Sequence, residues 1–267
     1  SRVPVCTPPA AEFPTVEAGE GEIDLELAQT LVRQMIDRTG FAMAQQDVRY
    51  YLNGMYMEIK EGRLRFVATD GHRLALCTAP GQVEAEDKSV IVPRKGILEL
   101  SRLLDADGSV TLTVGSNHIR AATDQFTFTS KLIDGKFPEY ERVLPRSPDK
   151  SVTGDRRELR QAFTRTAILS NEKYRGVRLA LTNGSLEITA NNPEQEQAEE
   201  MVPVDYSGEA LEVGFNVSYL LDVLGVLSGS TVRMSLSDSA SSALVEDGDA
   251  GGETDAEALY VVMPMRL

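Results

Sequence analysis

The alternation of apolar and polar residues predicts a β-hairpin that occurs twice along the chain. Two alternating segments flank Glu61-Gly62 within residues 55–68, and two more flank Asn183-Gly184 within residues 177–190. A period of two is typical of strands with one buried face, and Asn-Gly between such segments is a strong signal for a tight turn. We therefore predict an antiparallel strand pair at each place.

Apolar residues at helical spacing predict two helices in each half of the chain. Leu27, Leu31, Met35 and Ile36 form one stripe before the first hairpin. Its counterpart before the second consists of Leu159, Phe163, Ala167 and Ile168, with Arg157, Arg160 and Arg165 off the stripe. Another helix-like stretch follows each hairpin, and short strands close each half. The predicted helices cover residues 25–35, 95–104, 159–168 and 217–227, and the closing strands cover 110–114, 126–130, 232–236 and 260–263.

Several of these segments recur at one spacing. Residues 110–114 resemble 232–236 at a distance of 122 positions (232 − 110 = 122), and residues 64–70 resemble 186–192 at the same distance. Matches at a constant offset indicate one domain design that is used twice. We therefore predict an α+β fold of two duplicated domains, each with two helices packed on antiparallel sheets. The predicted division is a linker or remnant at 1–24 and domains at 25–139 and 140–267.

Composition places the chain among globular proteins with room for two cores. It has 267 residues, of which 42% are hydrophobic and 25% charged. No apolar run approaches the roughly 20 residues that span a bilayer, and the first residues lack the apolar core of a signal peptide. The distant Cys6 and Cys77 argue against a disulfide scaffold and favour the cytoplasm. Without a Walker A pattern, a dinucleotide loop or Cys/His metal spacing, the sequence predicts no cofactor and no metal.

Charge is unevenly distributed along the chain. The formal net charge of −14 argues by itself against nucleic-acid binding, yet basic residues gather between Arg156 and Arg178. Glu-rich segments occupy 194–200 and 246–257, and the second is expected to be a mobile acidic loop. Two interpretations stay open: a solvated basic helix, or a local positive face on a molecule with an acidic exterior.

A set of peptides gives the chain a specific resemblance. In order, from about residue 10 to the end, the chain closely resembles the bacterial DNA polymerase III beta subunit family, the sliding clamps. The duplicated domains of that family agree with the repeat. The peptides that carry the resemblance are residues 67–74, 92–96, 137–140, 170–173, 190–195, 215–219 and 260–267.

This resemblance implies a DNA-clamp fold and a non-enzymatic processivity factor that tethers a polymerase to double-stranded DNA without reading its sequence. The family has three such domains per chain, and two chains close head to tail into a ring, first domain against third. Only two domains are recognisable here. We therefore expect residues 1–24 to hold the exit of a missing first domain. We also expect this chain to be mainly monomeric, in contrast to the homodimeric ring of the full-length protein.

The resemblance also implies a peptide-binding cleft between the domains, where polymerase subunits, the clamp loader and repair factors dock short motifs. For Val261 and Val262, ordinary strand core is the competing interpretation. Tyr174 and Ala240 differ from the commoner Phe and Val of the family. The positions carried over are Leu52, Thr69, Gly71, His72, Arg73, Leu74, Pro138, Arg142, Val143, Tyr174, Asn216, Tyr219, Ser242, Val261, Val262, Met263, Pro264, Met265, Arg266 and Leu267.

A DNA-facing surface is the second implication of the resemblance. Phosphate contacts without base contacts make binding independent of sequence and sensitive to salt. For the two tyrosines in this set, strand core is an equal alternative. The candidate residues are Gln46, Tyr50, Tyr51, Arg94, Lys95, Arg102, Arg157, Arg160 and Arg165.

Two other functions compete with the clamp interpretation. Asp70 and His72 could serve a metal-dependent hydrolase or nuclease in which the carboxylate orients the imidazole, although the same residues also fit a turn after a strand. The duplicated design would also suit a structural repeat protein without a DNA role.

Overall fold

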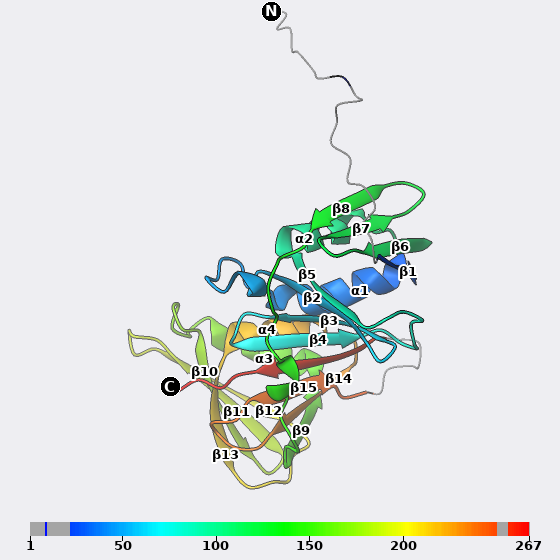
Figure 1. Cartoon of the computed structure of the whole chain (residues 1–267). Helices are drawn as coiled ribbons and strands as arrows, with labels where there is room; N and C mark the ends of the chain where they lie inside the picture. Colours follow the sequence, from blue (N-terminus) through cyan, green and yellow to red (C-terminus); the bar gives the residue numbers. More distant parts are fainter. Residues whose placement is uncertain (1–8, 10–21, 250–255, 267) are drawn as a thin grey trace, which may run out of the picture.

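The two halves of the chain have the same order of elements, as the repeat predicts. The computed structural model describes residues 9, 22–249 and 256–266 (Figure 1). In both halves a strand and a helix are followed by four strands, a second helix and three strands. The first half consists of β1 (Ile23–Ala28), α1 (Gln29–Thr39), β2 (Gly54–Lys60), β3 (Arg63–Thr69), β4 (Arg73–Thr78), β5 (Lys88–Pro93), α2 (Arg94–Leu103), β6 (Ser109–Val114), β7 (His118–Ala122) and β8 (Thr127–Lys131).

The second half repeats this order. It consists of β9 (Lys150–Asp155), α3 (Arg156–Ala167), β10 (Gly176–Thr182), β11 (Ser185–Asn191), β12 (Gln197–Pro203), β13 (Leu211–Asn216), α4 (Val217–Val226), β14 (Thr231–Leu236), β15 (Ala243–Asp247) and β16 (Glu257–Val262). Three short 3-10 helices cover Gly40–Ala42, Tyr50–Leu52 and Tyr140–Arg142. The predicted α+β class with antiparallel sheets is confirmed.

Most of the predicted elements are confirmed. Both hairpins form, as β2–β3 and β10–β11, and their turns place Gly62 and Gly184 at positive φ. Helices α2 and α4 agree with the predicted bounds to within one residue. Side-chain caps begin both helices of the second half. The side chain of Asp155 accepts a hydrogen bond from the Glu158 amide, and that of Asn216 accepts one from the Ser218 amide.

The start of the first helix was predicted wrongly. Leu25 and Leu27 lie on β1, opposite Leu112 and Val110 of β6, and the helix begins at Gln29. A spacing of four is also an even number, so Leu27 and Leu31 fit a strand pattern as well as a helical one. Ile168 was wrongly placed on the buried stripe of the third helix. It follows the last residue of α3 and is 76% exposed.

The halves are joined by one continuous antiparallel sheet. Its strand order is β5-β2-β3-β4-β16-β15-β14-β9, so β4 of the first half pairs directly with β16 of the second. We call this β4–β16 pairing the seam. It lies near the middle of Figure 1. Two further sheets, β1-β6-β7-β8 and β12-β11-β10-β13, complete the two halves.

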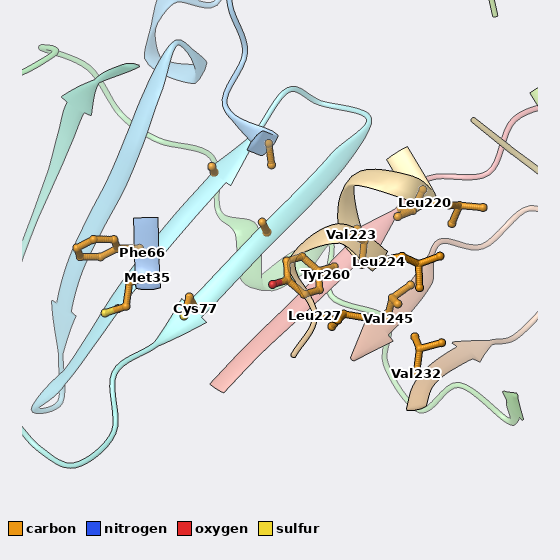
Figure 2. Close-up of a cluster of buried hydrophobic side chains, with 14 of the residues drawn as sticks. Met35, Phe66, Cys77, Leu220, Val223, Leu224, Leu227, Val232, Val245 and Tyr260 are labelled. Atoms are coloured by element: carbon orange, nitrogen blue, oxygen red, sulfur yellow. The ribbon is translucent and has the colours of Figure 1, made fainter. Parts of the chain in front are cut away.

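The hydrophobic core extends across the seam. Tyr260 of β16 is fully buried, and its ring centroid lies 5.9 Å from that of Phe41 in the first half. Arg38, near the end of α1, is buried and donates hydrogen bonds to the Ala256 carbonyl and to Ser228 Oγ, both in the second half. Figure 2 shows Tyr260 among side chains from both halves, including Cys77, Leu220, Val223, Leu224 and Leu227.

The acidic segment 246–257 was predicted to be a loop throughout, but both of its ends belong to strands. Glu246 and Asp247 belong to β15 and Glu257 begins β16, while 250–255 lie outside the described residues. In the described part of the chain, the longest α-helix has 12 residues, and none has the length and apolar character needed to cross a membrane.

Tyr260 provides a test of the shared core. Its hydroxyl is buried and has no hydrogen-bond partner within the described ranges. We expect Tyr260→Phe to leave the free energy of unfolding unchanged or to raise it by up to about 1 kcal/mol, since an unpaired buried hydroxyl costs free energy. Tyr260→Ala should lower it by about 3–5 kcal/mol, because it leaves a large cavity. Urea denaturation measures both values, and equal losses in the two variants would contradict this account.

Candidate functional site

The C-terminal tail lies across the boundary between the halves. The Met263 amide donates to the His72 carbonyl at 3.0 Å, in the turn that precedes β4. Two residues later the Met265 amide donates to the Gly214 carbonyl at 2.8 Å, on the edge strand β13 of the second half. The tail is therefore held by both halves, and its residues line two hollows.

The first hollow, which we call the linker hollow, has a volume of about 160 Å³. Its floor is the seam itself, because Leu74 of β4 and Val261 of β16 stand directly opposite each other in the strand register. Nine of the predicted peptide-binding residues line it: Leu52, Thr69, Gly71, Arg73, Leu74, Pro138, Val143, Val261 and Met263.

The second hollow, which we call the sheet-edge hollow, lies beside β13 and measures about 590 Å³. Three predicted residues of the tail line it, namely Pro264, Met265 and Arg266. Ala240, one of the two positions that depart from the family pattern, also lines it, together with Arg178, Glu212, Val213, Gly214 and Ser239.

Several predicted peptide-binding residues line neither hollow. Val262 is fully buried, as the strand-core interpretation requires. Asn216 caps α4, and Tyr174 is exposed with Lys173 Nζ 5.1 Å from its ring centroid. Leu267 lies outside the described residues. The other described residues that line neither hollow are His72, Arg142, Tyr219 and Ser242.

Gly71 shows why the turn before β4 needs a glycine. Its φ is +90°, and the Gly71 amide donates to Thr69 Oγ1 at 3.1 Å. A Cβ on Gly71 would lie 2.8 Å from Nη2 of Arg49. The glycine therefore provides both the left-handed backbone and the space in which the Arg49 guanidinium covers the turn.

Arg49 is a wall of the linker hollow that sequence reasoning missed. Asp47 holds it in place, with Nε–Oδ1 and Nη2–Oδ2 distances of 2.9 and 2.8 Å. Hydrogen bonds from Arg49 lower the pKa of Asp47 to about 2. The ion pair is therefore complete above the unfolded pKa of about 3.9 and is lost as the pH falls toward 2. Glu139 and Tyr140 also line the hollow and were also missed.

Arg73 is both a wall of the linker hollow and a bridge between the halves. Its guanidinium carbon lies 4.5 Å from the ring centroid of Tyr219 and 5.1 Å from that of Phe41. It forms ion pairs with Asp70 of the first half and Asp222 of α4. These cation–π contacts and ion pairs hold α4 against the turn that carries Gly71.

The hydrolase interpretation of Asp70 and His72 is not supported. Asp70 Oδ1 accepts from the backbone amides of His72 and Arg73, at 2.9 and 3.1 Å, and Oδ2 accepts from Arg73 Nε. The imidazole of His72 instead lies near the Tyr219 ring, with centroids 6.5 Å apart. Within ranges 22–249 and 256–266, no three His, Cys, Asp or Glu residues form a metal-binding group.

The basic residues of α3 form an exposed face. Arg157, Arg160 and Arg165 lie off the buried stripe, as predicted. Arg165 is paired with Glu200 through two bonds of 2.6 and 2.9 Å. Arg157 and Arg160 form no ion pair with any described residue. They line a surface hollow of about 530 Å³, together with Arg156, Gln161, Thr164 and Arg165.

The other candidate DNA contacts differ in their surroundings. The Arg94 guanidinium donates to the Gly40 and Met43 carbonyls, each at 3.3 Å, so the fold itself uses it. Lys95 and Arg102 are exposed on α2. Tyr50 and Tyr51 lie on a 3-10 helix and not on the strand that the competing alternative requires. Tyr50 is 56% exposed, whereas Tyr51 is partly buried against a hydrophobic cluster. Gln46 is exposed in the preceding loop.

Comparisons with known proteins match the whole of both halves. Residues 26–139 match a family model described as the central domain of the DNA polymerase III beta subunit, and residues 141–266 match its C-terminal domain. The chain is 63% identical over its whole length to the beta sliding clamp of Pseudomonas aeruginosa and 53% identical to that of Escherichia coli K12, covering 72% of each. A crystal structure of the Pseudomonas aeruginosa sliding clamp bound to griselimycin matches with a TM-score of 0.91 at 64% identity. That match covers 97% of this chain and 69% of the crystallised chain.

Proposed function

The chain belongs to the beta subunit family of DNA polymerase III, the beta sliding clamps, and on this premise we propose that partner proteins dock short peptides in the cleft at the seam. Its function is that of a DNA sliding clamp, a processivity factor that is not itself catalytic. The partners that we propose are polymerase subunits, the clamp loader and repair factors. Because these act on the chromosome, we place the protein in the cytoplasm.

One observation carries the peptide-docking proposal: the tail is held across the seam with an apolar hollow beside it. Leu74 and Val261 give the linker hollow an apolar floor and Pro138 gives it an apolar wall, and its volume of about 160 Å³ suits one large side chain. A buried cavity of about 150 Å³ is large enough to hold benzene. Met263, at the rim, can adapt to different side chains, which suits a site shared by several partners.

The expected affinity is moderate. Two apolar anchor side chains contribute about 1.5–3 kcal/mol each, and a few hydrogen bonds add about 1 kcal/mol each. Ordering the peptide subtracts part of this. The gross sum is about 6–9 kcal/mol, so the net affinity reaches at most roughly micromolar binding, which corresponds to about 8 kcal/mol. Such affinity allows partners to exchange on one clamp.

Removing the tail tests the proposed cleft. We expect deletion of residues 263–267 to abolish binding of a fluorescent Gln-Leu-x-Leu-Phe peptide, since the deletion removes a wall of each hollow. The fold should survive, because the deleted residues follow the last strand of the sheet. Fluorescence anisotropy measures the affinity, with a scrambled peptide as control and urea denaturation to verify folding. Unchanged affinity in the truncated chain would refute the cleft.

The exposed face of α3 supports a DNA contact made through phosphates. Arg157 and Arg160 are free of ion pairs with described residues, whereas Arg165 is held by Glu200. We propose that these two arginines meet the DNA backbone without reading bases. The negative net charge elsewhere would discourage DNA from binding outside this face.

Salt dependence tests this DNA contact. An open chain should bind duplex DNA weakly, since encirclement is what retains a clamp. At low salt, the Arg157→Ala/Arg160→Ala variant should bind more weakly than the parent chain, and its log–log salt dependence should flatten by about 0.9 for each phosphate that it no longer neutralises. Arg233→Ala, which removes an exposed arginine paired with Glu246, is the matched control. Identical salt slopes for all three proteins would contradict the assignment.

We propose that ring closure uses the free edge of β12. The seam pairs β4 with β16, and β12 occupies in the second half the position that β4 has in the first. Among the described strands, β12 pairs only with β11. Met201, on β12, and Ile168, at the end of α3, which packs against β12, are exposed apolar residues, as an interface would require.

Sedimentation tests the ring proposal. The family's ring pairs the C-terminal domain of one chain with the first domain of another, and neither matched family model is that first domain. We therefore expect analytical ultracentrifugation of residues 22–267 alone to give mainly monomer, while a protein that also carries the family's first domain should give a dimer that Met201→Glu weakens. A stable dimer of residues 22–267 would contradict this expectation.

A further inference from the structure

One wall of the linker hollow comes from a segment that belongs to no sheet. Pro138, Glu139, Tyr140 and Val143 line the hollow, and residues 137–143, which we call the linker segment, contain only a single 3-10 turn. The backbone bonds of this turn, from Arg142 to Glu139 and from Val143 to Tyr140, are local. The position of the wall must therefore be set by side chains of the segment.

Two aromatic side chains attach the linker segment to β2. The ring of Phe137 stacks on that of Tyr56, with centroids 4.6 Å apart and an interplanar angle of 8°. The Tyr140 hydroxyl donates a hydrogen bond of 2.6 Å to Oε2 of Glu58. Phe137 and Tyr140 belong to the same buried cluster as the linker-hollow residues Leu52, Leu74 and Val261.

The carboxylate that receives this bond is itself fully engaged. Glu58 is only 8% exposed, and Arg65, its register partner on β3, lies 3.3 Å away and balances its charge. Tyr56 Oη lies 3.3 Å from the other carboxylate oxygen. Burial and the bond to Glu58 raise the pKa of Tyr140, so its hydroxyl stays protonated and donating at neutral pH. A hydrogen bond to a charged, buried acceptor is among the stronger ones.

We propose that Tyr140 and Glu58 are positioning residues for the peptide site: their buried hydrogen bond fixes the linker segment as a wall of the linker hollow. This inference rests on the proposed peptide-docking function. Glu58 does not line the hollow, so its effect on a bound peptide acts through the linker segment. A loosened wall contacts an anchor side chain less closely and raises the cost of ordering the complex.

Tyr140→Phe tests the proposal, because it removes only the hydroxyl. For a Gln-Leu-x-Leu-Phe peptide we expect Kd to rise about tenfold, mainly through faster dissociation. The same peptide with its Leu-Phe anchors replaced by alanine should bind the parent and variant chains equally weakly, since it does not fill the hollow. The two peptides should therefore differ less in Kd for the variant than for the parent chain. General destabilisation would weaken the binding of both peptides and would not reduce this difference.

Tyr206→Phe is the matched control. Tyr206 is also buried, and its hydroxyl also donates a hydrogen bond, to the Glu209 carbonyl, but it lies in the second half and lines neither hollow. We expect the Tyr206→Phe variant to bind the peptide as tightly as the parent chain does, even if urea denaturation shows that it loses as much stability as Tyr140→Phe. Weakened binding in this control to the same degree would overturn the positioning role.

A double-mutant cycle at Glu58 completes the test. Glu58→Leu should weaken peptide binding at least as much as Tyr140→Phe, since it also removes the Arg65 ion pair and the Tyr56 contact. Adding Tyr140→Phe to Glu58→Leu should weaken binding little further, because their shared hydrogen bond is already lost. Glu58→Gln keeps an acceptor oxygen and should lie between Glu58→Leu and the parent chain. Additive losses would overturn the proposal, as would parent-like affinity in Tyr140→Phe. If the parent chain itself does not bind the peptide, the proposed function fails instead.

Discussion

The backbone pairing of β4 with β16 is the interaction on which the rest of the structure depends. It joins strands from the two halves into one sheet, with Arg73 opposite Val262 at one end and Thr78 opposite Glu257 at the other. Because side chains alternate along strands, this register puts Leu74 and Val261 together as the floor of the linker hollow. A slip of one residue would turn Val261 away from Leu74 and remove the floor.

The seam also explains why the tail is ordered. Strand β16 delivers Met263 to the His72 carbonyl and Met265 to the Gly214 carbonyl, so the chain end is bound by groups from both halves. Two arginines also bridge this boundary. Arg73 forms an ion pair with Asp222, and Arg38 donates a hydrogen bond to Ser228. The linker hollow is thus a consequence of how the halves meet, and neither half contains it alone, whereas the sheet-edge hollow is lined by residues of the second half.

Sequence patterns predicted the local elements well and the site only in part. The hairpins at Gly62 and Gly184 follow from turn chemistry and alternation, which are local properties. The pairing of β4 with β16 joins segments far apart in the sequence, and no local pattern specifies it. Resemblance to a family supplied Leu74 and Val261. Arg49 and Tyr140 were missed because their place at the linker hollow depends on contacts with Asp47 and Glu58.

The arginines illustrate the same limit. Resemblance to the family groups Arg94, Arg165 and Arg160 together as candidates for DNA contact. In the fold, carbonyls hold Arg94 and a carboxylate holds Arg165, while Arg160 is exposed without an ion pair to a described residue. Sequence gives the charge of a side chain, but its availability to a ligand depends on neighbours that only the folded chain brings near.

Native-state hydrogen exchange of the seam amides tests the central claim most directly. If the halves form one cooperative sheet, the hydrogen-bonded amides of β4 and β16 should exchange as slowly as those of β10 in the interior of its own sheet, through global unfolding. Seam amides that exchange much faster than those of β10, while both halves remain folded, would contradict the claim that this pairing holds the site together.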